Sequence, residues 1–250
     1  MDERRRGKMA MRSVFEVVVP GCIWVTEHPV WFNGARLRAR TTVVRLPGDK
    51  LWVHSPCPPS DIVDAELAAL GDVRWVVVPN RFHHRQAAAT AARHPRAVVV
   101  GPKSAELRNS KLRAALAADD PRYVDSTPEL TPIQLRGVPF LDETVFFHRP
   151  SGSLIAADLL ISACARDHWT WRIPARILGR YEKARTPPDV RLYTRASHAV
   201  AESIAQMSAL PLERILVAHA DPITDGPVQQ LAEAWRFGVP SDLRQAGPRV

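Results

Sequence analysis

Short apolar runs alternate with helical patterns through the first half of the chain. The turn Pro47-Gly48-Asp49-Lys50 has the composition of a hairpin loop, and Ser60 is placed to cap a helix. Because strands alternate with helices, this half predicts a layered α/β arrangement. Five runs have the length and β-branched content of strands: 14–19, 41–46, 51–54, 74–79 and 97–100. Three segments have a helical pattern: 60–70, 84–93 and 104–118.

The second half of the chain also contributes both kinds of element. Its predicted strands are 133–135, 144–148, 153–157 and 214–218, and its predicted helices are 196–209 and 228–237. We therefore predict an α/β protein with one domain over residues 13–240, an αββα sandwich of two mixed sheets flanked by helices. A plain doubly wound sheet is the alternative that the alternation leaves open. Residues 1–12 are predicted to be a disordered basic tail, and 241–250 a C-terminal tail.

Composition excludes several classes of protein. The chain has 250 residues, of which 46% are hydrophobic and 24% charged, so it is neither a disordered nor a fibrous protein. The longest apolar runs are too short to span a membrane. Its three cysteines are widely separated, and the basic N-terminus is not followed by a long apolar region. We therefore expect reduced thiols and a cytoplasmic location.

Positive charge is concentrated in one segment. The formal net charge is +8, and residues 165–195 hold eight Arg or Lys against three Asp or Glu. This segment also contains aromatic residues, among them Trp169 and Trp171. We expect most of these arginines to form a solvated face. Admission of an anionic substrate is the second interpretation, and stacking on nucleic acid is the third.

Three predicted strands are each followed by residues that can bind a metal ion. WVVVP is followed by His83 and His84, SLIAA by Asp158, and ILVA by His219. Since the carboxyl ends of parallel strands meet at one edge of a sheet, these side chains can converge. Imidazole and carboxylate are ordinary ligands of zinc, iron and manganese, and such an ion activates water for hydrolysis.

Each of these residues also has a purely structural interpretation. The pair His83-His84 could belong to a helix cap, Asp158 could cap the following helix, and His219 could be a hydrogen-bonded core residue. Neighbouring residues on a helix point about 100° apart, so His83 and His84 could not both reach one ion from a helix.

Four stretches of the chain resemble the metallo-β-lactamase superfamily, and in particular a branch classed as a domain of unknown function. These stretches are VVRLPGDKLWVHSPCP, WVVVPNRFHH, FLDETVFFHRPSGSLIAADLL and RILVAHADP, and the resemblance covers about residues 43–234. It implies an αββα sandwich. In that superfamily one strand ends in H-x-H-x-D-H, a later loop gives another His, and two further strand ends give a bridging Asp and a final His.

The resemblance assigns roles to residues of this chain. By that match His84 is the last His of the motif, His83 takes the place of its Asp, Asp158 is the bridging Asp and His219 is the final His.

The chain departs from the motif at three places. Pro79 and Arg81 stand near the two leading His positions, with Asn80 between them, and Phe140 stands where the middle His is expected. The nearby Asp142 and Glu143 offer oxygen atoms instead. The resemblance therefore implies a rearranged metal site rather than the usual pair of zinc ions.

The sequence thus predicts a metal-dependent hydrolase that cleaves an ester-like bond in a small anionic molecule. We expect its metal to be zinc, with iron and manganese as further candidates. A scaffold without metal, and a basic nucleic-acid-binding protein or nuclease, are the alternatives. We do not expect a membrane to be among its partners. The predicted catalytic residues are Asp158 and His84. The predicted metal ligands are His83, His84, Asp158, His219 and Asp142, and the predicted cleft residues are His54, Asn80 and Glu143.

Overall fold

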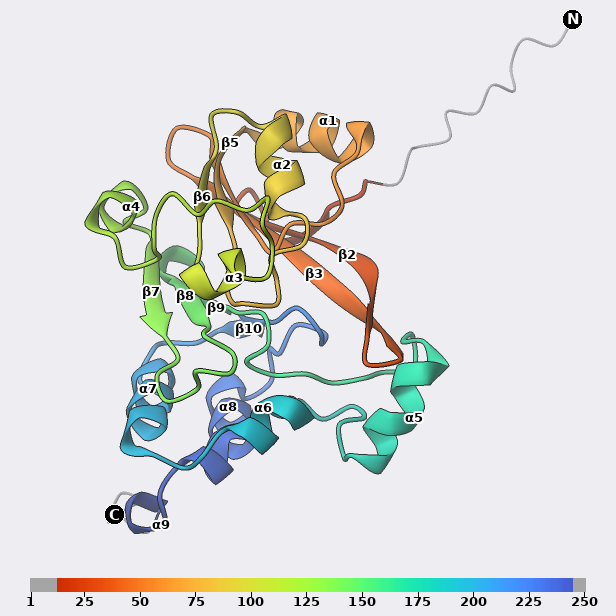
Figure 1. Ribbon diagram of the computed structural model, residues 1–250, viewed down its shortest axis with the longest axis vertical. Coiled ribbons are helices and arrows are strands. Elements are labelled where there is room, and N and C mark those ends of the chain that lie inside the picture. Colours follow the sequence, from red (N-terminus) through yellow and green to blue (C-terminus); the bar gives the residue numbers. More distant parts are fainter. Residues whose placement is uncertain (1–12, 245–250) are drawn as a thin grey trace, which may run out of the picture.

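Two β-sheets pack face to face with helices outside them (Figure 1). The computed structural model describes residues 13–244. The six-stranded sheet has the order β1-β2-β3-β4-β5-β6, with strands Glu16–Val19, Ile23–Phe32, Ala35–Leu46, Lys50–His54, Asp72–Val77 and Val98–Val100. The four-stranded sheet has the order β10-β9-β8-β7, with strands Arg214–Leu216, Ser153–Ile155, Thr144–His148 and Leu130–Gln134.

Both sheets are mixed. Strands β1 to β4 pair antiparallel, whereas β4, β5 and β6 run parallel. In the second sheet β9 and β10 are the parallel pair. The helices are α1 Asp61–Leu70, α2 Ala87–Arg93, α3 Lys103–Glu106, α4 Pro121–Ser126, α5 Trp169–Ile177, α6 Pro188–Tyr193, α7 His198–Ser208, α8 Pro227–Trp235 and α9 Ser241–Arg244.

Strand β4 shows how the alternation of its side chains builds the layers. Leu51 and Val53 belong to the apolar cluster beneath α1 and α2, whereas Trp52 lies in the cluster between the two sheets. The Trp52 indole N–H donates to the Tyr123 hydroxyl at 2.7 Å, so its polar atom is satisfied inside this inner core. A third cluster packs β7 to β10 against α7 and α8. The predicted αββα sandwich is therefore confirmed.

One predicted helix is wrong. Helix α3 spans only Lys103–Glu106, and the rest of the predicted 104–118 segment forms turns. Side chains there accept hydrogen bonds from backbone N–H groups, in place of the carbonyls that would accept them in a helix. Asn109 accepts from the Lys111 N–H at 3.1 Å, and Glu106 accepts from the Ala114 N–H at 2.7 Å.

The long β2–β3 hairpin was not predicted. It pairs Ile23 with Val44 at one end and Phe32 with Ala35 at the other. Pro29 and the charged residues along both strands obscured the apolar pattern, although Leu37 and Ala39 do alternate with arginines in β3. The hairpin projects from the sheet toward α5 (Figure 1).

The two predicted tails are only partly visible. Residues 1–12 lie outside the described residues, as do 245–250. The start of the predicted tail 241–250 forms helix α9. Within residues 13–244, no helix is long and apolar enough to cross a lipid bilayer.

Candidate metal centre

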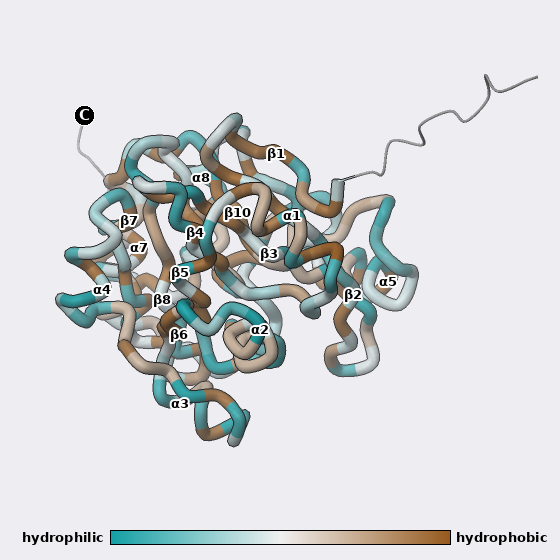
Figure 2. The backbone as a smooth tube through the Cα atoms, turned by 90° about the horizontal axis from the view of Figure 1, so that it is seen from above, coloured by the Kyte–Doolittle hydropathy of each residue, from teal (hydrophilic) through white to brown (hydrophobic). Residues whose placement is uncertain are grey.

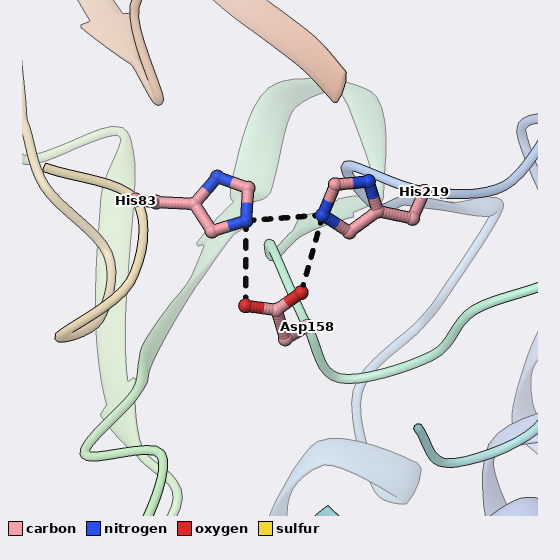
Figure 3. Close-up of side chains that lie close together, drawn as sticks. All are labelled: His83, Asp158 and His219. Atoms are coloured by element: carbon pink, nitrogen blue, oxygen red, sulfur yellow. Dashed lines mark hydrogen bonds and ion pairs between the residues drawn. The ribbon is translucent and has the colours of Figure 1, made fainter. Parts of the chain in front are cut away.

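Three side chains from separate loops converge on one point (Figure 3). His83 Nε2 lies 3.3 Å from one carboxylate oxygen of Asp158, and His219 Nε2 lies 3.4 Å from the other. The two Nε2 atoms are themselves 3.2 Å apart. Within the described part of the chain, this is the one group of three or more His, Cys, Asp or Glu residues close enough to share an ion.

The topology explains the convergence. Asp158 and His219 follow the parallel strands β9 and β10, whose carboxyl ends meet at the same edge. His83 follows β5 of the other sheet. Its loop is shaped by Asn80, whose side-chain oxygen accepts the N–H groups of Phe82 and His83 at 2.8 and 3.0 Å.

Both imidazole rings are fixed by contacts at their Nδ1 atoms. His219 Nδ1 is 2.5 Å from the carbonyl oxygen of Arg38. Because a carbonyl only accepts, Nδ1 carries the proton there, and a neutral ring then presents a lone pair at Nε2. His83 Nδ1 bonds the Ser55 hydroxyl at 2.6 Å. Ser55 is buried and has a left-handed backbone with φ of +51°, a conformation that non-glycine residues seldom adopt.

The electrostatics of the cluster follow from burial and from Asp158. Burial alone would lower the pKa of His83, but the charge and hydrogen bond of Asp158, together with the charge of Glu143, outweigh burial and raise it. Burial dominates for His219 and lowers its pKa. Burial would raise the pKa of Asp158, yet His83, His219 and Asn80 together hold it below its usual range. Asp158 is therefore a carboxylate at neutral pH.

A second carboxyl group lies directly behind Asp158. Glu143 accepts the N–H groups of Ala157 and Asp158 at 2.7 and 3.0 Å. The Asn80 amide donates to both carboxyl groups, at 2.8 Å to Asp158 and 3.0 Å to Glu143. Burial and the charge of Asp158 raise the pKa of Glu143 to about 7. Asn80 thus separates two acidic groups that would otherwise repel each other.

The structure places five of the predicted residues outside the cluster of His83, Asp158 and His219. His84 lines the adjoining cavity but is not part of the cluster to which its neighbour His83 belongs. Asp142 accepts from the Ser104 hydroxyl at 2.5 Å, instead of joining the ligands. Asn80 and Glu143 are fully buried behind Asp158 and do not line the cavity. His54 is buried and stacks on Trp52 with ring centres 5.2 Å apart.

Sequence reasoning missed two residues near the cluster. Ser55 follows β4, and only the packing of β4 against the His83 loop reveals it. His28 lies on β2 opposite Ala39, and both line the cavity. Burial, together with His83 and His219, lowers the pKa of His28 to about 4. Recognising the two-residue alternation of β2 and β3 would have placed His28 on the same face as Val30.

Two of the eight basic residues of the segment 165–195 form ion pairs. Arg166 pairs with Glu27 and Asp221, and Arg185 pairs with Glu233. Arg180 is buried and donates to the Thr186 carbonyl. These contacts tie the segment to the domain, so it offers less free positive charge than its composition indicates.

Comparisons with known proteins identify the fold. A scan against protein-family models and a search of curated proteins give no match. Solved structures do match. A metallo-β-lactamase from Erythrobacter litoralis, with β-mercaptoethanol in its active site, has a TM-score of 0.61 at 14% identity over 89% of this chain and 95% of its own. Metallo-β-lactamase DIM-1, exposed to ceftazidime, has a TM-score of 0.58 at 11% identity over 89% and 95%.

A third match is the metallo-β-lactamase FIM-1 from Pseudomonas aeruginosa in its mono-zinc form. Its TM-score is 0.54 at 12% identity, over 90% of this chain and 96% of its own. The chain therefore has the fold of the metallo-β-lactamase superfamily, as the sequence resemblance implied.

Proposed function

We propose that the protein is a metal-dependent hydrolase with a single-ion centre formed by His83, Asp158 and His219. The observation that carries this proposal is the convergence of their side chains. The two Nε2 atoms lie 3.2 Å apart, and they face different oxygens of Asp158, at 3.3 Å for His83 and 3.4 Å for His219. Tetrahedral zinc with bonds of about 2.0–2.1 Å separates its ligand atoms by about 3.3–3.4 Å. An octahedral ion with the same bond lengths would need about 2.8–3.0 Å. The 3.2 Å separation of the two Nε2 atoms is closer to the tetrahedral spacing than to the octahedral one.

The donor set supports the same choice. Two imidazole nitrogens and one carboxylate oxygen are the protein ligands of several catalytic zinc sites, which keep a further position open for water or substrate. Two facing Nε2 lone pairs repel each other unless a cation or a shared proton lies between them. Iron and manganese remain weaker candidates for the same three ligands.

The residues around the centre have separate tasks. A divalent ion held there would supply Lewis acidity and lower the pKa of a bound water. The Arg38 carbonyl and the Ser55 hydroxyl fix the two rings through their Nδ1 atoms. Asn80 orients Asp158. Apolar residues of the adjoining cavity, such as Leu37 and Trp171, exclude bulk water from the reacting bond.

Metal analysis tests the proposal. Purified wild-type protein should contain about one equivalent of transition metal per chain, zinc first, and His83→Ala and His219→Ala should each lose it. His84→Ala is the matched control, because it removes an adjacent imidazole outside the cluster and should retain the metal. A folded wild type that stays empty after zinc addition would instead favour a non-catalytic scaffold.

A second candidate function rests on Ser55. Its hydroxyl bonds His83 Nδ1 at 2.6 Å, and the opposite nitrogen of that ring faces Asp158 at 3.3 Å. A serine, a histidine and an aspartate linked in this order form the nucleophilic centre of metal-independent hydrolases. Ser55 also lines the cavity. Ester hydrolysis that persists with a chelator and is lost in Ser55→Ala would select this mechanism.

A further inference from the structure

The cavity beside the candidate metal centre is lined by two chemically different groups of residues. Its volume is about 670 Å³, and the three candidate ligands line it. This size is within the range of about 300–1,000 Å³ that small-molecule sites occupy. The apolar group comes from the β2–β3 hairpin, the loop after β9 and α5: Val30, Trp31, Phe32, Leu37, Ile161 and Trp171.

The polar group comes from segments of the lining other than the hairpin, the loop after β9 and α5. His84, Arg85 and Gln86 are consecutive, and Arg108 joins them because the side chain of its neighbour Asn109 donates to the His84 carbonyl at 3.4 Å. Two exposed arginines therefore line the same cavity as the candidate metal ligands.

Neither arginine is neutralised within residues 13–244. Ion pairs hold other arginines near the site, such as Arg38 and Arg166, but none involves Arg85 or Arg108. The carboxylates that line the cavity are Asp158, which contacts the two imidazoles, and Asp189, which accepts from the Val190 N–H.

The setting of Arg108 leaves its donors available. Its guanidinium lies 4.8 Å from the ring centre of Phe82. Such stacking fixes the plane of the group, while its N–H edges stay free to bind a carboxylate or phosphate. The stacking thus orients Arg108 without occupying its N–H donors.

We propose that this cavity binds a small organic anion, with its carboxylate or phosphate held by Arg85 and Arg108 and its apolar body against the hairpin and α5. This names the substrate class of the proposed hydrolase and in that respect rests on the proposed function, although the binding itself needs no metal. A nucleic acid needs repeated phosphate contacts along a groove, whereas two arginines in one cavity suit a single anionic group.

Three probes of similar size test the proposal. Binding of 2-naphthoate, 2-naphthyl phosphate and the neutral 2-naphthamide is measured by calorimetry on metal-free protein with a chelator present, so that no anion can bind a metal ion. The variants are wild type, the double variant Arg85→Gln/Arg108→Gln, and Arg149→Gln. Arg149 is an exposed arginine outside the cavity lining and serves as the matched control.

Wild type and Arg149→Gln should bind at least one of the anions about tenfold or more tightly than the amide, since bonds to charged groups contribute that much. The double variant should reduce this preference to about twofold or less, with amide binding unchanged. The tighter anion then distinguishes a carboxylate from a phosphate substrate. Equal binding of all three probes by wild type, or an undiminished preference in the double variant, would overturn the proposal.

The metal content of the same proteins separates the two proposals. If the anion site is wrong, the preference is absent while wild type still binds metal. If the metal centre is wrong, wild type binds no metal while the preference for the anion remains.

Discussion

The Nε2 atoms of His83 and His219 lie 3.2 Å apart, although 136 positions separate the two residues in the sequence. Each ring is fixed through its other nitrogen, His219 by the Arg38 carbonyl and His83 by the Ser55 hydroxyl. Neither ring can therefore turn away without losing a hydrogen bond. The proposed cation would therefore need little reorganisation of these rings in order to bind.

Removing the Ser55 hydroxyl should weaken metal binding. Ser55→Gly deletes the partner of His83 Nδ1 and suits the left-handed backbone at this position, so the fold should be retained. We expect zinc affinity to fall about 10–100-fold, as for other residues that orient a ligand from behind. Competition with a chromophoric chelator measures this affinity, and an unchanged value would show that Ser55 does not orient His83.

Neutralising Asp158 should abolish metal binding without unfolding the protein. Asp158→Asn keeps the size of the side chain and removes the charge between the two imidazoles. The pKa of His83 should then fall, because Asp158 is what raises it against burial. Elemental analysis should find no bound zinc, and circular dichroism should remain that of wild type. A variant that retains one equivalent of zinc would refute the assigned ligand set.

Zinc should stabilise the folded protein, by an amount that grows with the logarithm of its concentration above the dissociation constant. An ion that binds only the native state adds about 2.7 kcal/mol to the free energy of unfolding at one hundred times its dissociation constant. We expect a chelator to lower the Tm of wild type and to leave the Tm of His219→Ala unchanged. An equal shift in both proteins would mean that the ion binds elsewhere.

Acid should destabilise the protein partly through His54. Burial, with a smaller effect of His83, lowers the pKa of His54 to about 3 from an ordinary value of 6.5. Between these values the unfolded chain binds a proton that the folded protein does not, so the free energy of unfolding falls as the pH falls from 6.5 to 3. One proton contributes at most about 1.4 kcal/mol per pH unit.

The variant His54→Phe tests this dependence. Phe preserves the stack on Trp52 and the edge contact with Phe146 but cannot be protonated. Denaturant unfolding between pH 4 and 7 should therefore show a shallower loss of stability for the variant than for wild type. Parallel curves would indicate that other groups cause the acid sensitivity.

The bond between Trp52 and Tyr123 should contribute to stability independently of the metal. Tyr123→Phe leaves the buried indole N–H of Trp52 without its partner at 2.7 Å. An unsatisfied buried donor costs about 1–3 kcal/mol. Urea unfolding should show a loss of this size, with zinc content unchanged.

The sequence predicted the sheets and the strand ends better than the site. Asp158 and His219 each follow a strong apolar strand, so their place at one sheet edge followed from the alternation alone. The choice between His83 and His84 did not, because Asn80 shapes that loop through bonds that no local pattern reveals. Ser55 and His28 reach the site through the packing of distant strands. Packing between segments far apart in the sequence cannot be predicted from a short stretch of it.

The three candidate ligands are divided between the two sheets: His83 follows β5 of the larger sheet, and Asp158 and His219 follow strands of the smaller one. All strands of the larger sheet lie within residues 16–100, but the third candidate ligand lies more than a hundred positions later. The centre is therefore completed only when His219 has been synthesised and the second sheet has docked. Contacts between such distant segments form slowly, so metal loading is expected to be a late event in the folding of this chain.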